Sequence, residues 1–429
     1  MNLGVATGVT PVRLTIPARA RAWLATTMVA VLVLSAQASA VTMSGALVAD
    51  DAGATPKLYH AALIVAGAVV LFRGCVVRPR TELLAYFGVT LSTSLLAYLA
   101  FEPRVAAVKL LIAFYVALVA AGVGRAVDAT AVLRGCRVAS VAFLLLVTAK
   151  NAQQVPDFVA FLVSPAGHPN VPTLAGGGLN LEATWLALSA IFLIGTALFL
   201  PFVLAAAATS ALYASRAGVL VAAVAVCAAL AHAWGGWRAA HHTARSQPPV
   251  EASRVRHRWR RRGLAVLLAA AAAGAAGAAA VAVREYGDAM YVAQRFASIG
   301  EEPGSMGRLT LWRGGLRVFA EHPLGVGVGN AVPELRRTLG VDVPEDNLHD
   351  IYLQHAVETG LPGLFVLLVL AVAVARRLVA ARFRDHLLLF VVGYLVVGAI
   401  QFTGVDAMFW LAYGLQSGTS GGGHGGGVA

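Results

Sequence analysis

The sequence predicts an all-α polytopic membrane protein with about twelve transmembrane helices and one large helical loop on the outer side. Hydrophobic residues make up 59% of the 429-residue chain and charged residues only 13%, a composition typical of membrane proteins. Several apolar runs approach the roughly 20 residues that a helix needs to cross a bilayer. Arginines cluster in the loops between these runs, as the positive-inside rule expects of cytoplasmic loops.

The apolar runs give candidate spans in chain order. They cover 22–44, 58–72, 82–101, 105–124, 138–150, 184–213, 217–235, 262–283, 361–376, 386–402 and 404–416. The run 184–213 contains Gly195 and Pro201 near its middle, so we expect two short helices that meet at a break. This break makes about twelve crossings, with both termini inside and Arg216 on the outer side. A single long helix would instead make Arg216 cytoplasmic.

We expect residues 1–417 to form one transmembrane domain and the glycine-rich tail 418–429 to be disordered. The net charge of +12 is explained by cytoplasmic loops in contact with membrane phospholipids. It therefore does not imply a nucleic-acid partner. The three cysteines show no CxxC spacing, which argues against a zinc site and a disulfide framework.

Residues 284–360 form the one long polar stretch between apolar runs, and the candidate chemistry lies there. A helical wheel of 305–321 places six apolar side chains on one arc, with Arg308 near its centre and Arg313 opposite. The six are Leu309, Leu311, Trp312, Leu316, Val318 and Phe319. A guanidinium on a packing face needs an anionic partner, and a ligand could supply it. Snorkelling to a lipid phosphate is the alternative.

A second helix is expected after Pro344, with Asp346 as its N-cap and His349 on its first turns. Asp346 and Asp350 could each hold the His349 imidazole and leave one ring nitrogen free to accept a proton from a hydroxyl nucleophile. The alternative is a histidine that only bridges the loop.

Arg216 stands between two apolar runs, where it could bind an anionic ligand or act as an interfacial anchor. Two arginines on one side of the membrane would suit a diphosphate, because the guanidinium fork donates two hydrogen bonds at once. Carboxylates near His349 could alternatively hold a divalent metal, but the arginines already offer the charge that a metal would supply, so we expect no metal and no cofactor. They are Asp342, Glu345, Asp346 and Asp350.

The motifs resemble those of the bacterial O-antigen ligase and polymerase superfamily. The resemblance rests on an Arg four residues before Trp312, on HPLGVGVGN at 322–330, and on a histidine followed by ETGLPGL. Ser215-Arg216 and GGGLNLEATWLA at 176–187, similar to the family's outer loop, add to it. The family's usual His-Asn pair is His349-Asp350 here, which leaves the role of Asp350 open.

The resemblance implies a metal-independent, inverting glycosyltransferase in the bacterial inner membrane, with its active site facing the periplasm. Its donor would be a glycan on undecaprenyl diphosphate, held by Arg216 and Arg308, with His349 as the base. The acceptor would be a lipid A–core sugar hydroxyl in a ligase, a growing glycan in a polymerase, or a protein in an O-oligosaccharyltransferase. The chain most resembles a ligase. A transporter of lipid-linked glycans is the alternative from another class; it would expect charges within the spans, and Lys109 is the clear mid-span charge.

Overall fold

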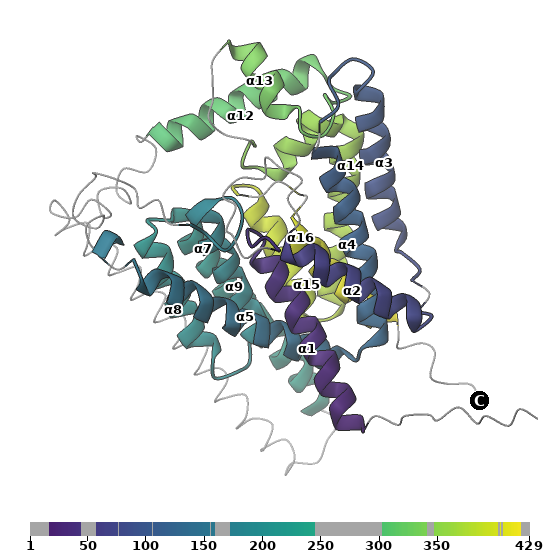
Figure 1. Ribbon diagram of the computed structural model, residues 1–429, viewed down its shortest axis with the longest axis vertical. Helices are drawn as coiled ribbons and strands as arrows, with labels where there is room; N and C mark the ends of the chain where they lie inside the picture. Colours follow the sequence, from purple (N-terminus) through teal and green to yellow (C-terminus); the bar gives the residue numbers. More distant parts are fainter. Residues whose placement is uncertain are drawn as a thin grey trace, which may run out of the picture.

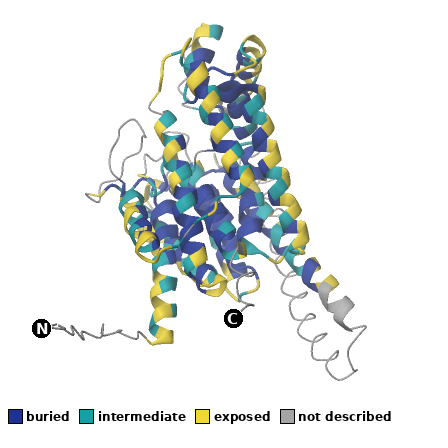
Figure 2. Cartoon of the chain, turned by 90° about the vertical axis from the view of Figure 1, so that its right-hand side faces the viewer, coloured by how far each residue is buried: buried dark blue, intermediate teal, exposed yellow. Residues whose placement is uncertain are grey.

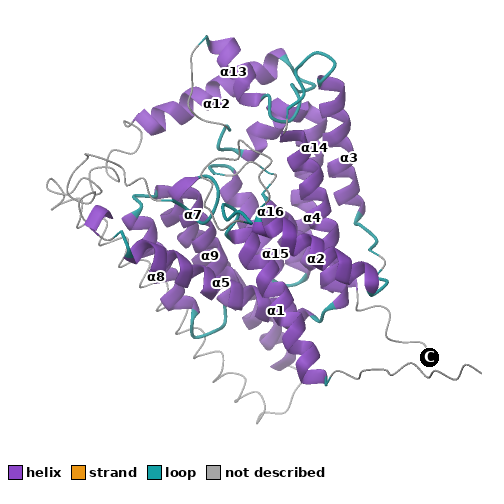
Figure 3. Ribbon diagram, in the orientation of Figure 1, coloured by secondary structure: helices purple, strands orange, loops and turns teal. Residues whose placement is uncertain are grey.

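The structure is a computed structural model in which the helices pack side by side into one bundle (Figure 1). It describes residues 17–43, 57–75, 77–104, 106–154, 156–158, 172–244, 303–340, 347–401, 404 and 406–421. Within these ranges the regular structure is helical (Figure 3), apart from an isolated bridge between Thr42 and Lys57. The all-α prediction is confirmed for this part of the chain.

Helices that pack against each other include α4 with α16, α1 with α5, α3 with α14, and α7 with α9. The helices described before residue 245 are α1 (Ala18–Gln37), α2 (Leu58–Phe72), α3 (Thr81–Ala97), α4 (Ala106–Ala126), α5 (Ala129–Ala152), α7 (Gly178–Ser189), the short 3-10 helix η1 (Ala190–Leu193), α8 (Phe199–Leu212) and α9 (Arg216–Ala244). After it come α12 (Pro303–Glu321), α13 (Ala331–Leu339), α14 (Ile351–Ala380), α15 (His386–Gly398) and α16 (Ala407–Gly421).

Five helices in the described ranges are long and apolar enough to cross a membrane, so the protein is a multi-pass membrane protein. They are α1, most of α4, α5, the part of α9 up to Arg238, and α14; α2, α3, α7 with η1, α8 and α15 are shorter apolar helices. The count of about twelve crossings stays a prediction, because the expected span 262–283 lies outside the described residues. So do the glycine-rich residues 422–429.

The apolar run 184–213 is broken, as the sequence predicted. A turn at 194–198 separates η1 from α8, and Gly195 adopts φ +81° there. One boundary differs from expectation: the helical run begins at Gly178 and not at 184, so most of 176–187 is helix α7, which buries Glu182 and Trp185. Glu182 can sit inside the helix bundle because Lys150 of α5 forms an ion pair with it.

Contacts along α15 show which helix ends lie together. Its first residue, His386, hydrogen-bonds to Ile194 O at 3.1 Å, in the turn after η1. Near its other end, Leu395 O accepts a hydrogen bond of 2.8 Å from Tyr352 in the first turn of α14. The start of α14 lies at the end of the bundle where α12 and α13 are found (Figure 1). Since α8 leads away from the 194–198 turn, we expect Arg216, which follows α8, to lie at that end as well.

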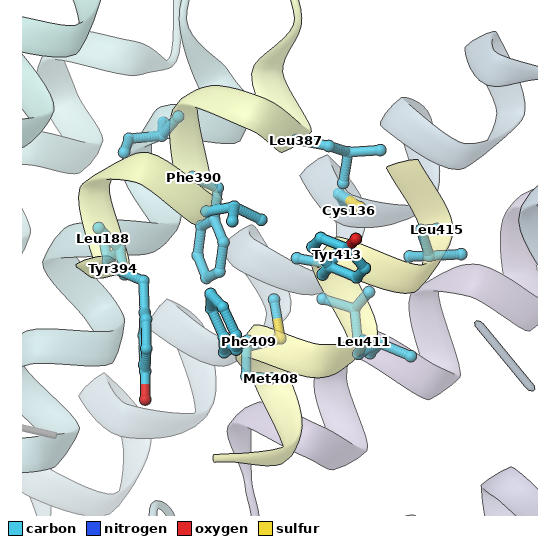
Figure 4. Packing of buried hydrophobic residues seen from close by; sticks show 14 of the residues in the cluster. Cys136, Leu188, Leu387, Phe390, Tyr394, Met408, Phe409, Leu411, Tyr413 and Leu415 are labelled. Carbon is cyan, nitrogen blue, oxygen red and sulfur yellow. The ribbon is translucent and has the colours of Figure 1, made fainter. Parts of the chain in front are cut away.

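The core is apolar and rich in aromatic rings. Buried residues line the interior of the bundle, whereas exposed residues face outward along the helices (Figure 2). In Figure 4 Phe390 and Tyr394 of α15 point toward α16, where Phe409 stacks on Tyr394 with ring centroids 4.3 Å apart. Such stacked rings contribute about 0.5–1.5 kcal/mol beyond their buried area. This packing fixes the position of α15 against α16.

The first prediction concerns topology and uses a variant without native cysteines. Ala197, in the 194–198 turn, and Leu324, beside α12, are both exposed and lie at opposite ends of the bundle. We expect Leu324→Cys to react with a membrane-impermeant maleimide in intact cells, and Ala197→Cys to react only after permeabilisation. Reaction of both from outside, or the reverse pattern, would contradict a periplasmic position for Arg216 and α12.

Candidate active site

The site is built on a break in α14. Gly360 has non-helical φ and ψ of 69° and −168°, and Pro362 follows within the same helix. A proline has no N–H to donate to the carbonyl four residues earlier, so the helix cannot satisfy Glu358 O by itself. Leu361 N–H, which a regular helix would direct at Val357 O, donates to Pro323 O at 2.9 Å instead.

The glycine-rich turn before α13 satisfies the two carbonyl groups that the break releases. Val326 N–H donates to Val357 O at 3.0 Å, and Gly327 N–H donates to Glu358 O at 2.8 Å. These hydrogen bonds dock the GVGVGN turn against α14. With Leu361 donating the other way, three backbone hydrogen bonds join two segments about 30 residues apart in the sequence.

Glycine is required where these segments touch. A Cβ on Gly325 would lie 2.5 Å from Glu358 O, and one on Gly360 would lie 2.3 Å from the carbonyl carbon of Leu324. Both residues also have positive φ angles, +92° and +69°, which residues with a side chain rarely adopt. The motifs HPLGVG and ETGLPG are thus two sides of one backbone contact.

A buried polar chain leads from this contact to the residue before His349. Glu358 Oε1 accepts hydrogen bonds from Gly329 N–H at 2.8 Å and from the Gln354 amide at 2.6 Å. Gln354 Oε1 in turn accepts Leu348 N–H at 2.8 Å. Glu358 and Gln354 are only 7% and 6% exposed. Because buried polar groups are costly unless paired, this chain holds Leu348 in one position.

The indole of Trp312 fixes Leu348 from the other side. Trp312 Nε1–H donates to Leu348 O at 2.9 Å, so both backbone groups of Leu348 are bound. Trp312 lies four residues after Arg308 on α12, hence on the same face of that helix. This contact brings the helix that carries Arg308 against the loop that carries His349.

His349 lies in a loop before α14, not on a helix. Its φ is +54°, and its N–H donates to Asn347 Oδ1 at 2.8 Å. The expectation that Asp346 caps a helix containing His349 is therefore wrong. A left-handed residue other than glycine costs about 1–3 kcal/mol and persists where its surroundings enforce it, as the two bonds to Leu348 do here.

Asp350 is the N-cap of α14. Its Oδ1 accepts from Tyr352 N–H at 2.8 Å and from Leu353 N–H at 3.0 Å. Burial raises the pKa of the Asp350 carboxyl above its ordinary value, and the two backbone N–H groups act against that shift. The carboxylate thus fixes where α14 begins, directly after His349, which is a role that the sequence left open.

Arg308 lies on the edge of the packed face of α12 and is half-buried. The centre of that face is formed by Leu311, Gly314, Gly315 and Val318. Leu309 and Leu316, placed on the apolar arc from the sequence, are 39% and 58% exposed. The expectation that Arg308 lies at the centre of the packed face is therefore wrong: Arg308 lies about 70° around the helix from that centre. Arg313 is exposed, as predicted.

Arg216 is half-buried at the first residue of α9, beside a buried polar cluster. Tyr213, the C-cap of α8, donates from its hydroxyl to Glu182 Oε1 at 2.5 Å, and Lys150 pairs with the same carboxylate. Ser215, fully buried, accepts Gly218 N–H at 3.1 Å. The turn that carries Arg216 is thus anchored to α5 and α7.

The structure joins the helix that carries Arg308 to the loop that carries His349 through the Trp312–Leu348 hydrogen bond, whereas Arg216 lies on another element, at the start of α9. Sequence reasoning missed Gln354 and Glu358; their spacing of four residues on a helix was the available signal. Of the proposed carboxylate cluster, Asp342, Glu345 and Asp346 lie outside the described residues. Among the residues described, no group of three His, Cys, Asp or Glu side chains could hold a metal ion.

Comparison with known protein families identifies this part of the chain. Residues 183–368 match a family described as O-antigen ligase. The match covers less than half of the chain and supports its membership of the O-antigen ligase and polymerase superfamily. The matched region contains Arg216, Arg308, Trp312 and His349, and it includes both sides of the α14 contact. A comparison with curated proteins finds no match.

The second prediction tests the backbone contact at the α14 break. Gly360→Ala would force a side chain into a glycine-only conformation, at a cost of about 1–3 kcal/mol from the backbone alone, with the clash at Leu324 in addition. We expect a clearly lower thermal unfolding temperature for the purified protein.

Gly88→Ala is the matched control, because a Cβ there meets nothing within 4 Å and alanine stabilises a helix relative to glycine. We expect its unfolding temperature to be unchanged or higher. Equal stability of the Gly360→Ala variant and the wild type would contradict the role of the contact.

Proposed function

We propose that this protein is an O-antigen ligase-type glycosyltransferase, which moves a glycan from undecaprenyl diphosphate to a lipid A–core sugar hydroxyl at the periplasmic face of the inner membrane. The superfamily match over 183–368 supports the reaction class. The observation that carries the proposal is the hydrogen bond from Trp312 to Leu348, because it places an arginine and a histidine of suitable chemistry on adjoining elements.

In the proposed reaction His349 is the general base. Its imidazole takes the proton of the acceptor hydroxyl while the hydroxyl oxygen attacks the anomeric carbon of the donor sugar. The bond from that carbon to the diphosphate oxygen breaks as the new glycosidic bond forms, so the configuration inverts. The fixed backbone of Leu348 and the Asp350 cap restrict the motion of His349, which favours a base that must meet its substrate in one geometry.

Arg308 and Arg216 bind the diphosphate of the donor. Negative charge develops on the diphosphate as it leaves, and guanidinium groups stabilise it through paired hydrogen bonds without any proton transfer. Both residues are half-buried, a position in which charge interactions are screened less than at an open surface. With two cations in place, the reaction requires no metal ion.

Two other activities of the same superfamily use the same donor chemistry with another acceptor hydroxyl. A polymerase would extend a growing glycan, and a protein O-oligosaccharyltransferase would modify serine or threonine. The rival from another class is a transporter that moves the lipid-linked glycan without a covalent product.

The third prediction decides between these activities. Purified protein is mixed with an undecaprenyl-diphosphate glycan and a truncated lipopolysaccharide acceptor, with and without EDTA. We expect a covalent glycan–lipopolysaccharide product, formed at the same rate in both conditions. Polymerised donor without acceptor modification would indicate a polymerase, and movement of the glycan across a proteoliposome membrane without any product would indicate the transporter. A rate abolished by EDTA and restored by a divalent ion would contradict the metal-independent mechanism.

The fourth prediction separates the proposed roles. His349→Ala should lower kcat by about 10²–10⁴-fold and leave donor binding nearly intact, because a general base contributes to the rate and not to ground-state contacts. Arg308→Ala should weaken donor binding as well as turnover. Arg308→Lys should rescue poorly, since a point charge cannot replace the bidentate fork.

Arg313→Ala is the control, since Arg313 is an exposed arginine on the same helix. We expect a mild effect. Turnover of His349→Ala within a factor of about three of the wild type would remove the base role, and equal damage from the Arg313 and Arg308 substitutions would remove the assignment of Arg308.

A further inference from the structure

A second group of charged side chains lies where α3 begins and α14 ends. Arg80 is the N-cap of α3, and Arg377 is in the last turn of α14. Arg377 donates to Glu82 Oε1 at 2.5 Å, and Tyr413 of α16 donates to the same oxygen at 3.2 Å. Arg80 donates to the hydroxyl of Ser420, near the end of α16. Three helices thus meet at this cluster, at the opposite end of α14 from His349.

The cluster holds two guanidinium groups and one carboxylate. Arg80 Nε and Arg377 Nη1 are buried and lack a hydrogen-bond partner in the described residues. Burial lowers the pKa of Arg80, and the charge of Arg377 lowers it further, so the two cations repel each other here. A buried donor without an acceptor is destabilising. The cluster therefore has unused donors and excess positive charge.

An anion could reach the outer edge of this cluster. Ser420 is exposed, and Arg80 is half-buried beside it. Leu84, four residues after Arg80 and so on the same face of α3, is 47% exposed. A phospholipid at the end of a spanning helix needs a cationic group for its headgroup and an apolar surface for its acyl chains. The arginines and the apolar face of α3 provide these two features side by side.

We propose that Arg80 and Ser420, with the charge of Arg377 behind them, bind the phosphate of an anionic phospholipid headgroup. The phosphate oxygens accept hydrogen bonds from the half-buried Arg80 guanidinium and from the exposed Ser420 hydroxyl, and arginine is suited to this because its planar fork matches phosphate geometry. Arg377, which donates to Glu82 and to Ala373 O, contributes positive charge behind them. Glu82 limits the affinity, since it neutralises one of the two cations. This inference concerns the end of the bundle away from His349, and it holds whether or not the proposed transfer reaction is correct.

The fifth prediction tests the lipid site by native mass spectrometry of the delipidated protein in detergent. Dioleoyl phosphatidylglycerol, zwitterionic dioleoyl phosphatidylcholine and inorganic phosphate are titrated separately. We expect tighter binding of phosphatidylglycerol than of phosphatidylcholine. Arg80→Ala should weaken phosphatidylglycerol binding about fivefold, the effect of roughly one basic residue at a membrane surface.

Arg376→Ala is the matched control, because Arg376 is an exposed neighbour of Arg377 on the same helix; we expect less than a twofold change. Glu82→Gln separates a lipid site from a purely structural ion pair. This substitution should tighten phosphatidylglycerol binding, because it removes the carboxylate that competes with the phosphate. If the cluster were only a structural ion pair, the substitution would weaken that pair and would not tighten lipid binding.

Three results would overturn the proposal. They are equal affinity for the two lipids, equal effects of the Arg80 and Arg376 substitutions, and no gain on Glu82→Gln. Displacement of phosphatidylglycerol by an equal concentration of inorganic phosphate would assign the site to free phosphate and overturn the lipid assignment.

Discussion

The site depends on the exchange of hydrogen bonds at the break in α14. Pro362 and the non-helical Gly360 leave Val357 O and Glu358 O without partners from their own helix, and the turn 323–329 supplies them. Each unmet buried carbonyl would cost about as much as a lost hydrogen bond. The break is therefore stable only while the turn is docked, and the turn can dock only because the break offers acceptors. Neither segment has this conformation without the other.

This mutual dependence extends to the proposed base. Gly329 belongs to the docked turn, and its N–H binds Glu358, which binds Gln354, which binds the backbone of Leu348 beside His349. A helix-breaking sequence some ten residues after the histidine thus determines where the histidine lies. The indole of Trp312 completes the constraint from α12. Rigid elements and a second layer of hydrogen bonds are what a precise site requires.

Much of the bundle could be predicted from composition and from local breaks. Gly195 and Pro201 indicated the interruption of 184–213, since both residues disfavour a continuous helix whatever surrounds them. The start of α14 could not be predicted in the same way. Asp346 and Asp350 are both acceptable N-caps, and the choice of Asp350 depends on Trp312 and Gln354, which hold Leu348 out of the helix. Distant contacts decide between two locally equivalent starts.

The placement of Arg308 failed for a different reason. A wheel that scores hydrophobicity treats Gly314 and Gly315 as neutral, yet both glycines pack closely against neighbouring side chains: a Cβ on Gly314 would lie 2.8 Å from Leu339, and one on Gly315 3.1 Å from Leu348. Close approach moves the packed face toward the glycines and leaves Leu309 and Leu316 exposed. Arg308 consequently lies at the edge of the packed face of α12 and not at its centre. For a residue proposed to bind a diphosphate this is the more suitable position, because its head group can reach a ligand while its stem packs on the protein.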